Sequence, residues 1–316
     1  MRVQSFLVSA SAFITSTTAT MQGFNYGAND ADGTCRTYDN YYKMFSTQRV
    51  LPNAPGFVSA RLYTSVQCGT TNSPIEAIKA ALDTSTDLLL GVWASSGQEA
   101  INNEITALQE AAKTFPQGLK QRVKAISVGS EDLYRASSEG QNNGAGVGAD
   151  ATTILSYIQQ VRQALKGTAL EGIPVGHVDT LTGWILPENA GVIQAADFLG
   201  YNGFPYFDTA SGANDANNQA GMFEGGLQKL ESVAGDTPVW VTETGFPVRG
   251  PTVGQAVPSP ENSKVYWDSV GCKSLFGKRN TFWYTLYDAN TAQTDMSFAV
   301  IEPDGGNPKF SLQCPA

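Results

Sequence analysis

One motif near the end of the chain, Pro238-Val-Trp-Val-Thr-Glu-Thr-Gly-Phe-Pro247, has the pattern of a short strand that ends in a carboxylate. Its β-branched and aromatic residues favour a strand, and Gly245 and Pro247 end it. Glu243 is therefore expected at the carboxyl end of that strand. A second stretch, Val123-Lys-Ala-Ile-Ser-Val-Gly-Ser-Glu131, has the same design. We expect the rest of the chain to bring Glu131 and Glu243 together.

Six more segments have the composition of buried strands. They lie at 21–27, 57–63, 87–93, 173–179, 197–201 and 281–287. In most of the intervals between them, apolar residues recur at helical spacing. Strands that alternate with helices predict an α/β protein, a single (β/α)8 barrel that spans residues 20–316. A doubly wound open sheet is the alternative, but Gly23 and Gly27 do not form the glycine-rich phosphate turn that such a sheet would need.

The composition excludes several classes of function. The chain has 316 residues, 41% of them hydrophobic and 16% charged, with a net charge of −9 and no cluster of Lys and Arg. This acidic balance disfavours nucleic acid and anionic membrane surfaces as partners. His177 is the only histidine and none of the four cysteines forms a CxxC pair, so we expect no metal and no other cofactor.

The first residues have the pattern of a secretory signal peptide. Arg2 supplies a positive start, residues 6–14 are modestly apolar, and Thr17-Thr18-Ala19 is a small-residue cleavage site. We expect residues 1–19 to be removed and the protein to be secreted, either extracellular or in the cell wall. No later stretch is apolar enough to span a bilayer.

The cysteines can be placed on the predicted barrel. Cys35 follows the first strand and Cys68 the second, and neighbouring strands have neighbouring loops. Cys272 precedes the last strand and Cys314 lies near the chain end. We therefore expect the pairs Cys35–Cys68 and Cys272–Cys314, which suit an exported protein.

Functional residues of β/α barrels lie at the carboxyl ends of the strands. Those ends carry glutamates, other polar residues and aromatics, namely Tyr26, Tyr63, Trp93, Glu131, Asp179, Asn202, Glu243 and Asp288. Two carboxyl groups are what glycosidic bond cleavage needs, aromatic rings suit the faces of pyranoses, and amides and carboxylates suit hydroxyl groups.

Several of these residues also have a structural interpretation. Glu131 could pair with Arg135, four residues further on. Asp132 and Asp288 are more often structural than catalytic. His177 and Asp179 could be a base and its orienting acid, although a satisfied histidine in the barrel interior is favoured. Trp93, Trp240 and Trp283 could belong to the core.

Six motifs, in order along the chain, resemble glycoside hydrolase family 17. They are Gly-Phe-Asn-Tyr-Gly27, Arg-Leu-Tyr63, Val-Gly-Ser-Glu-Asp-Leu-Tyr-Arg135, Gly-His-Val-Asp-Thr180, Gly-Phe-Pro-Tyr-Phe207 and Val-Thr-Glu-Thr-Gly-Phe-Pro247. The chain is most similar to the fungal cell-wall endo-1,3-β-glucosidases of that family. The resemblance implies a barrel that acts on β-1,3-glucan with retention of configuration.

The resemblance also implies roles for individual residues. Glu131 would be the proton donor and acid/base, and Glu243 the nucleophile. The implied substrate-binding residues, with the strand-end acid Asp288 added as a further candidate, are Tyr26, Tyr63, Ser130, Asn202, Tyr206, Trp283 and Asp288. Ser130 stands where the family usually has an asparagine, and Phe246 where it usually has a tryptophan.

The expected function is a secreted, monomeric endo-1,3-β-glucanase that remodels or degrades wall glucan through a covalent glucosyl-enzyme. Retention needs two carboxyl groups ~5–5.5 Å apart, with the pKa of Glu131 raised by the nearby negative charge. Three alternatives remain open: a 1,3-β-glucanosyltransferase, a hydrolase for another β-glucan, and a non-catalytic glucan-binding wall protein.

Overall fold

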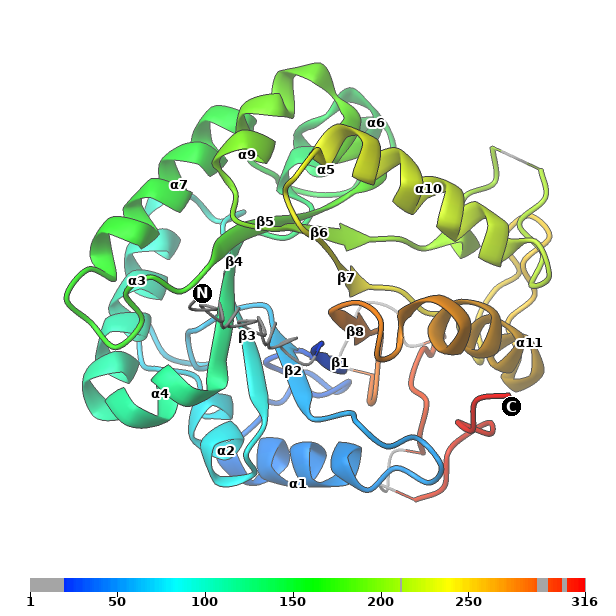
Figure 1. The fold of residues 1–316 in the computed structure, drawn as a ribbon, viewed down its shortest axis with the longest axis horizontal. Helices are drawn as coiled ribbons and strands as arrows, with labels where there is room; N and C mark the ends of the chain where they lie inside the picture. The colour runs from blue at the N-terminus through cyan, green and yellow to red at the C-terminus, as the bar shows by residue number, and fades with distance from the viewer. Residues whose placement is uncertain (1–19, 211, 289–294, 303–305, 316) are drawn as a thin grey trace, which may run out of the picture.

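Eight parallel strands form a closed barrel in the order of the chain, with helices outside it (Figure 1). This computed structural model describes residues 20–210, 212–288, 295–302 and 306–315. The strands are β1 Gln22–Tyr26, β2 Ser59–Leu62, β3 Asp87–Val92, β4 Val123–Val128, β5 Val175–Thr180, β6 Leu199–Asn202, β7 Val239–Glu243 and β8 Thr281–Trp283. The predicted (β/α)8 architecture is confirmed, and the signal-peptide prediction lies outside the described residues.

Helices fill the intervals between successive strands. They are α1 Tyr38–Arg49, α2 Ala77–Asp83, α3 Gly97–Thr114, α4 Pro116–Arg122, α5 Asp132–Ala136, α6 Ser138–Asn142, α7 Ala151–Ala164, α8 Leu181–Ile185, α9 Ala190–Ala195, α10 Gln219–Ala234 and α11 Pro260–Tyr266. Two 3-10 helices, η1 Pro187–Asn189 and η2 Pro205–Phe207, and a π-helix, η3 Trp267–Leu275, complete the set. Asp150 caps α7 by accepting from the Thr153 amide, and Ser259 caps α11 by accepting from Asn262. Within the described ranges, no helix combines the length and apolar character needed to cross a membrane.

The barrel interior changes from apolar to polar along its axis. At the amino ends of the strands, Met21, Leu89, Ala125, Phe198 and Phe282 form a buried cluster with Trp240 packed against it. Nearer the carboxyl ends the buried interior residues are Asn25, Arg61, Thr242 and Asn202, which hydrogen-bond across strands. Side chains that alternate with these face the helices and form the larger apolar core. The polar end of the interior is therefore where a site can form.

Two disulfides join segments at the barrel periphery. Cys35–Cys68 links the loops after β1 and β2, with the Cα atoms 5.4 Å apart. Cys272–Cys314 links η3 to the chain end, with the Cα atoms 5.5 Å apart. Both are the pairs expected from the sequence.

Candidate active site

A cavity of about 820 Å³ lies at the carboxyl ends of the strands and contains both glutamates. Its walls come from the ends of β1, β2, β3, β4, β7 and β8 and from the loops that follow them. The lining residues are Asn25, Gly27, Ala28, Asn29, Gly33, Tyr63, Trp93, Ser130, Glu131, Arg135, Ala145, Glu243, Tyr284 and Thr285. The fold thus brings Glu131 and Glu243 into one cavity, as the sequence predicted.

Glu243 is the last residue of β7 and is bound by a cation from β2, three strands away around the barrel. Arg61 Nη1 lies 2.6 Å from Glu243 Oε1, and both side chains are buried. The same guanidinium donates to Asn25 Oδ1 at 2.8 Å and to Ser130 Oγ at 3.0 Å. Because a guanidinium stabilises an adjacent negative charge, Glu243 is placed to act as a carboxylate.

Glu131 has a different setting. Asn202 Nδ2 donates to Glu131 Oε1 at 3.0 Å, and Arg135 Nη2 lies 3.5 Å from Oε2. The pairing with Arg135 that the sequence spacing allowed is therefore present, although it is long. Burial first, and the charge of Glu243 second, raise the pKa of Glu131 to about 7, against the lowering effect of the Asn202 hydrogen bond. Glu131 can thus hold a proton near neutral pH.

The backbone of Glu131 is left-handed, with φ 62°, which is uncommon for a residue other than glycine. Neighbouring contacts hold it there. The Glu131 amide donates to the Val178 carbonyl at 2.8 Å, and the Ser130 amide donates to Asp132 Oδ2 at 2.8 Å. At Gly129, with φ 84°, an added Cβ would lie 2.4 Å from that same Asp132 oxygen. Asp132 is therefore structural, as favoured by the sequence.

His177 supports this turn from behind. Its Nδ1 lies 2.6 Å from the Val128 carbonyl and its Nε2 lies 3.0 Å from Asp179 Oδ2. Since a carbonyl and a carboxylate both accept hydrogen bonds, these contacts favour the protonated form of the ring, in which both nitrogens donate. Burial lowers the pKa of His177, but the hydrogen bond and charge of Asp179 and the charge of Asp132 outweigh burial and raise the pKa.

The expectation of a histidine inside the barrel is wrong. Alternation along β5 turns Val178 toward Gly200 and Thr242 in the interior, so His177 faces outward and packs edge-on against Trp184 of α8. Asp179 accepts from the amides of Leu133 and Tyr134 at the start of α5. This pair is a support for α5 and does not line the cavity.

Aromatic rings form one wall of the cavity. The Arg61 guanidinium lies 4.6 Å from the centroid of the Tyr63 ring, and the Arg135 guanidinium 5.8 Å from that of Trp93. Burial and then the charge of Glu243 raise the pKa of Tyr63, so its hydroxyl keeps its proton. Tyr63, Ser130 and Asn202 thus lie where the sequence placed them: two line the cavity and Asn202 contacts Glu131.

Tyr26 and Trp283 do not line the cavity, which corrects two predictions. The Tyr26 hydroxyl donates to Gln48 of α1 at 2.8 Å, and its ring packs against Phe45. Trp283 packs against Trp267, behind the barrel. In both strands, alternation gives the interior position to the preceding residue, and each predicted aromatic faces a helix instead.

Tyr206 and Asp288 also differ from their predicted roles. Tyr206 is fully buried in a cluster of rings, and its hydroxyl donates to the Pro251 carbonyl. Asp288 accepts from the Ser297 hydroxyl at 2.6 Å and from the Phe298 amide at 3.0 Å, which anchors the returning segment. Both residues shape loops around the site and neither lines the cavity.

Arg61 and Asn25 are the main site residues that sequence reasoning missed. Each is a polar residue inside a predicted strand, at a place where alternation points inward, and this was the available signal. Asn25 donates through its amide to the carbonyls of Thr242 and Phe282, both at 3.0 Å. In the described ranges, no group of three or more His, Cys, Asp and Glu side chains is arranged to hold a metal ion.

Comparison with known proteins identifies the family to which this chain is similar. Residues 23–302 match the family described as the BtgE/BtgC glycoside hydrolase domain. A probable glucan endo-1,3-beta-glucosidase of Aspergillus oryzae is 46% identical over 94% of this chain and 63% of that protein. One from Aspergillus fumigatus is 45% identical over 98% of this chain and 69% of that protein. The chain thus spans about two thirds of the length of these relatives.

Solved structures share the fold. A β-1,3-glucanosyltransferase of Rhizomucor miehei, solved as an active-site mutant with laminaritriose, has a TM-score of 0.74 at 24% identity and covers 93% of this chain and 98% of its own. A plant β-glucan endohydrolase has a TM-score of 0.63 at 15% identity, covering 92% and 99%. At these identities, the likeness concerns the barrel itself.

Proposed function

The chain belongs to the family of the BtgE/BtgC glycoside hydrolase domain, and from this premise we propose that it is a retaining endo-1,3-β-glucanase. The expected membership of glycoside hydrolase family 17 is confirmed. The observation that carries the proposal is the pair of carboxyl groups in unlike settings. Glu243 lies against a guanidinium, whereas the pKa of Glu131 is raised to about 7 by burial and by Glu243.

In the first step, Glu243 attacks the anomeric carbon of a glucosyl unit, and the bond from that carbon to the 3-oxygen of the next unit breaks. Glu131 transfers its proton to the departing oxygen. The product is a glucosyl ester of Glu243, with the anomeric configuration inverted. Arg61 holds the attacking carboxylate, and Asn202 and Arg135 hold the acid.

In the second step, Glu131 is a carboxylate and removes a proton from water. The water oxygen attacks the anomeric carbon and Glu243 leaves as a carboxylate, which restores the original configuration. If the 3-hydroxyl of another glucan takes the place of water, the enzyme is a glucanosyltransferase, the activity named for its Rhizomucor miehei neighbour. A non-catalytic role is disfavoured, since both carboxyl groups and their partners are present.

We further propose a secreted, monomeric protein whose partner is wall β-1,3-glucan. Two disulfides support an oxidising compartment, and the similar proteins are named as glucan endo-1,3-beta-glucosidases of fungi.

The test is a product profile. The protein is incubated with a reduced β-1,3-gluco-oligosaccharide of one length, and the products are sized by mass over time. Shorter products alone support hydrolysis, and products longer than the substrate support transfer. Binding without any change of the substrate would contradict the proposed enzyme.

A further inference from the structure

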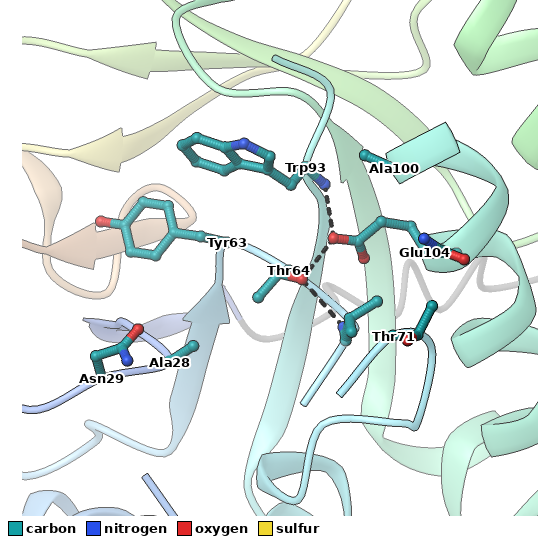
Figure 2. Close-up of a pocket in the computed structure, with 10 residues that line it drawn as sticks. Ala28, Asn29, Tyr63, Thr64, Thr71, Trp93, Ala100 and Glu104 are labelled. Atoms are coloured by element: carbon teal, nitrogen blue, oxygen red, sulfur yellow. Dashed lines mark hydrogen bonds between the residues drawn. The ribbon is translucent and has the colours of Figure 1, made fainter. Parts of the chain in front are cut away.

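A second cavity of about 370 Å³ opens beside the active site and shares a wall with it. We call it the side pocket; it is lined by Ala28, Asn29, Tyr63, Thr64, Val66, Thr71, Trp93, Ala100, Asn103 and Glu104. Ala28, Asn29, Tyr63 and Trp93 line both cavities. In Figure 2, Tyr63 and Trp93 lie on one side of the side pocket, and Ala100 and Glu104 of α3 lie on the other with Thr71.

The side pocket is held in shape by one buried carboxyl group. Glu104, on α3, accepts hydrogen bonds from the Thr64 hydroxyl and from the Trp93 amide at 3.1 Å (Figure 2). It also accepts from the Ser65 amide at 2.6 Å. These bonds join α3 to the loop after β2 and to the end of β3. Because Glu104 is 3% exposed and fully engaged, the two aromatic walls keep fixed positions before any ligand arrives.

The chemistry of the lining suits a neutral sugar. Glu104 is the only charged residue among the described residues that line the side pocket, and its oxygens are already bonded. In the described part of the chain, the side chains of Asn103 and Thr71 and the indole N–H of Trp93 have no hydrogen-bond partner. The aromatic rings match the apolar faces of a pyranose, and the free hydroxyl, amide and indole N–H groups match its hydroxyl groups.

We propose that the side pocket is a further glucosyl subsite. A β-glucan chain that occupies the catalytic cavity continues past Tyr63 and Trp93 and places one more sugar unit against α3. The volume of about 370 Å³ falls within the ~300–1,000 Å³ of small-molecule sites. This inference rests on the proposed glucanase function, because it names an additional contact for the same substrate.

Two neighbouring asparagines on α3 provide a matched test. Asn103 faces the side pocket, whereas Asn102 is exposed and accepts from Gln98 on the helix surface. We compare Asn103→Trp, which fills the side pocket, with Asn102→Trp, which adds the same ring to the surface. Asn103→Ala removes the amide without adding volume. Circular dichroism melts of each variant check folding.

Each variant is assayed on reduced β-1,3-gluco-oligosaccharides, from the shortest that is cleaved upward. For the unmodified protein, we expect kcat/KM to rise at the length that reaches the side pocket. Asn103→Trp should abolish that rise, a loss of about tenfold (about 1.4 kcal/mol) for the longer substrates only. Asn103→Ala should reduce the rise, and Asn102→Trp should keep it.

The possible results separate this inference from the proposed function. An equal effect of Asn103→Trp at every length, or no effect at any length, would overturn the subsite while leaving the glucanase intact. If Asn103→Trp fails to fold, Asn103→Ala decides the question by the same criterion. If the unmodified protein cleaves none of the oligosaccharides, the proposed function itself has failed.

Discussion

The ends of β4 and β7 have the same design in the sequence but form different environments in the structure. β7 continues as a regular strand up to Glu243, which meets Arg61 at 2.6 Å. After β4 the chain turns into a left-handed conformation at Glu131, whose nearest partner is the neutral amide of Asn202 at 3.0 Å. One carboxyl group is thus paired with a cation and the other with an amide.

The difference shows that partners from distant strands decide what each glutamate can do. Arg61 is 182 positions from Glu243, and Asn202 is 71 positions from Glu131. A cation favours the ionised form, whereas burial beside a second carboxylate favours the protonated form. The barrel therefore places two identical side chains in unlike settings, which is what the proposed retaining cleavage needs.

Among these changes, replacing Glu243 should have the largest effect on turnover of β-1,3-glucan. Glu243→Ala removes the proposed nucleophile, and we expect turnover of β-1,3-glucan to fall on the order of 10⁴-fold or more while glucan binding persists. With an activated aryl glucoside and added azide, the variant should form the α-glucosyl azide, since azide enters on the face that Glu243 left. Retained turnover without azide would reverse the assignment.

Replacing Glu131 should give a smaller loss and the opposite azide product. Glu131→Ala should lower turnover of glucan by ~10²–10⁴-fold, the usual contribution of general acid–base catalysis. An aryl glucoside with a good leaving group needs little acid assistance and should lose much less. Azide should then attack the glucosyl-enzyme and give the β-azide. Equal losses on both substrates would argue against Glu131 as the acid.

Replacing the arginine beside Glu243 should lower the free energy of unfolding more than replacing the arginine beside Glu131. Arg61→Met leaves the buried carboxylate of Glu243 without its partner, and we expect a loss of ~3–5 kcal/mol in the free energy of unfolding. Arg135→Ala is the matched control, because its contact with Glu131 is longer, at 3.5 Å. Urea unfolding at pH 7 measures both. A similar cost for the two variants would remove this distinction between the sites.

The pH profile tests the state of Glu131. Its pKa is raised to about 7, by burial first and by Glu243 second. Since the protonated form is the acid, kcat/KM should decline as pH rises through about 7. Asn202 lowers the pKa of Glu131 by its hydrogen bond, so Asn202→Ala should shift the decline to higher pH. A shift to lower pH would contradict the arrangement.

Replacing His177 should have the smallest effect on catalysis. Because it is the only histidine, its ring signals in nitrogen NMR of a tag-free chain need no assignment. Both ring nitrogens should keep their protons to a higher pH than those of a free histidine, since each faces an acceptor and the pKa of His177 is raised. His177→Gln should reduce kcat by less than about tenfold and leave KM unchanged. A ring that loses its proton at a lower pH than a free histidine would show that its contacts are weaker than the distances indicate.

Much of the fold and the meeting of Glu131 with Glu243 in one cavity could be predicted from the sequence, because buried parallel strands have a strong pattern and their carboxyl ends share one face. Tyr26 and Trp283 were misplaced because a strand-end position does not say which way a side chain points. Arg61 was missed because its partner is remote in sequence. The left-handed turn at Glu131 depends on contacts with β5, which no local pattern reveals.

The disulfide between Cys35 and Cys68 lies beside the wall that the active-site cavity and the side pocket share. Asn29, which lines both cavities, donates to the Cys68 sulfur at 3.0 Å. The covalent bond therefore supports the wall that the two cavities share and lies outside the strand ladder of the barrel. The position of Asn29 thus depends on a cross-link between the loops after β1 and β2, and not only on the hydrogen bonds that close the barrel.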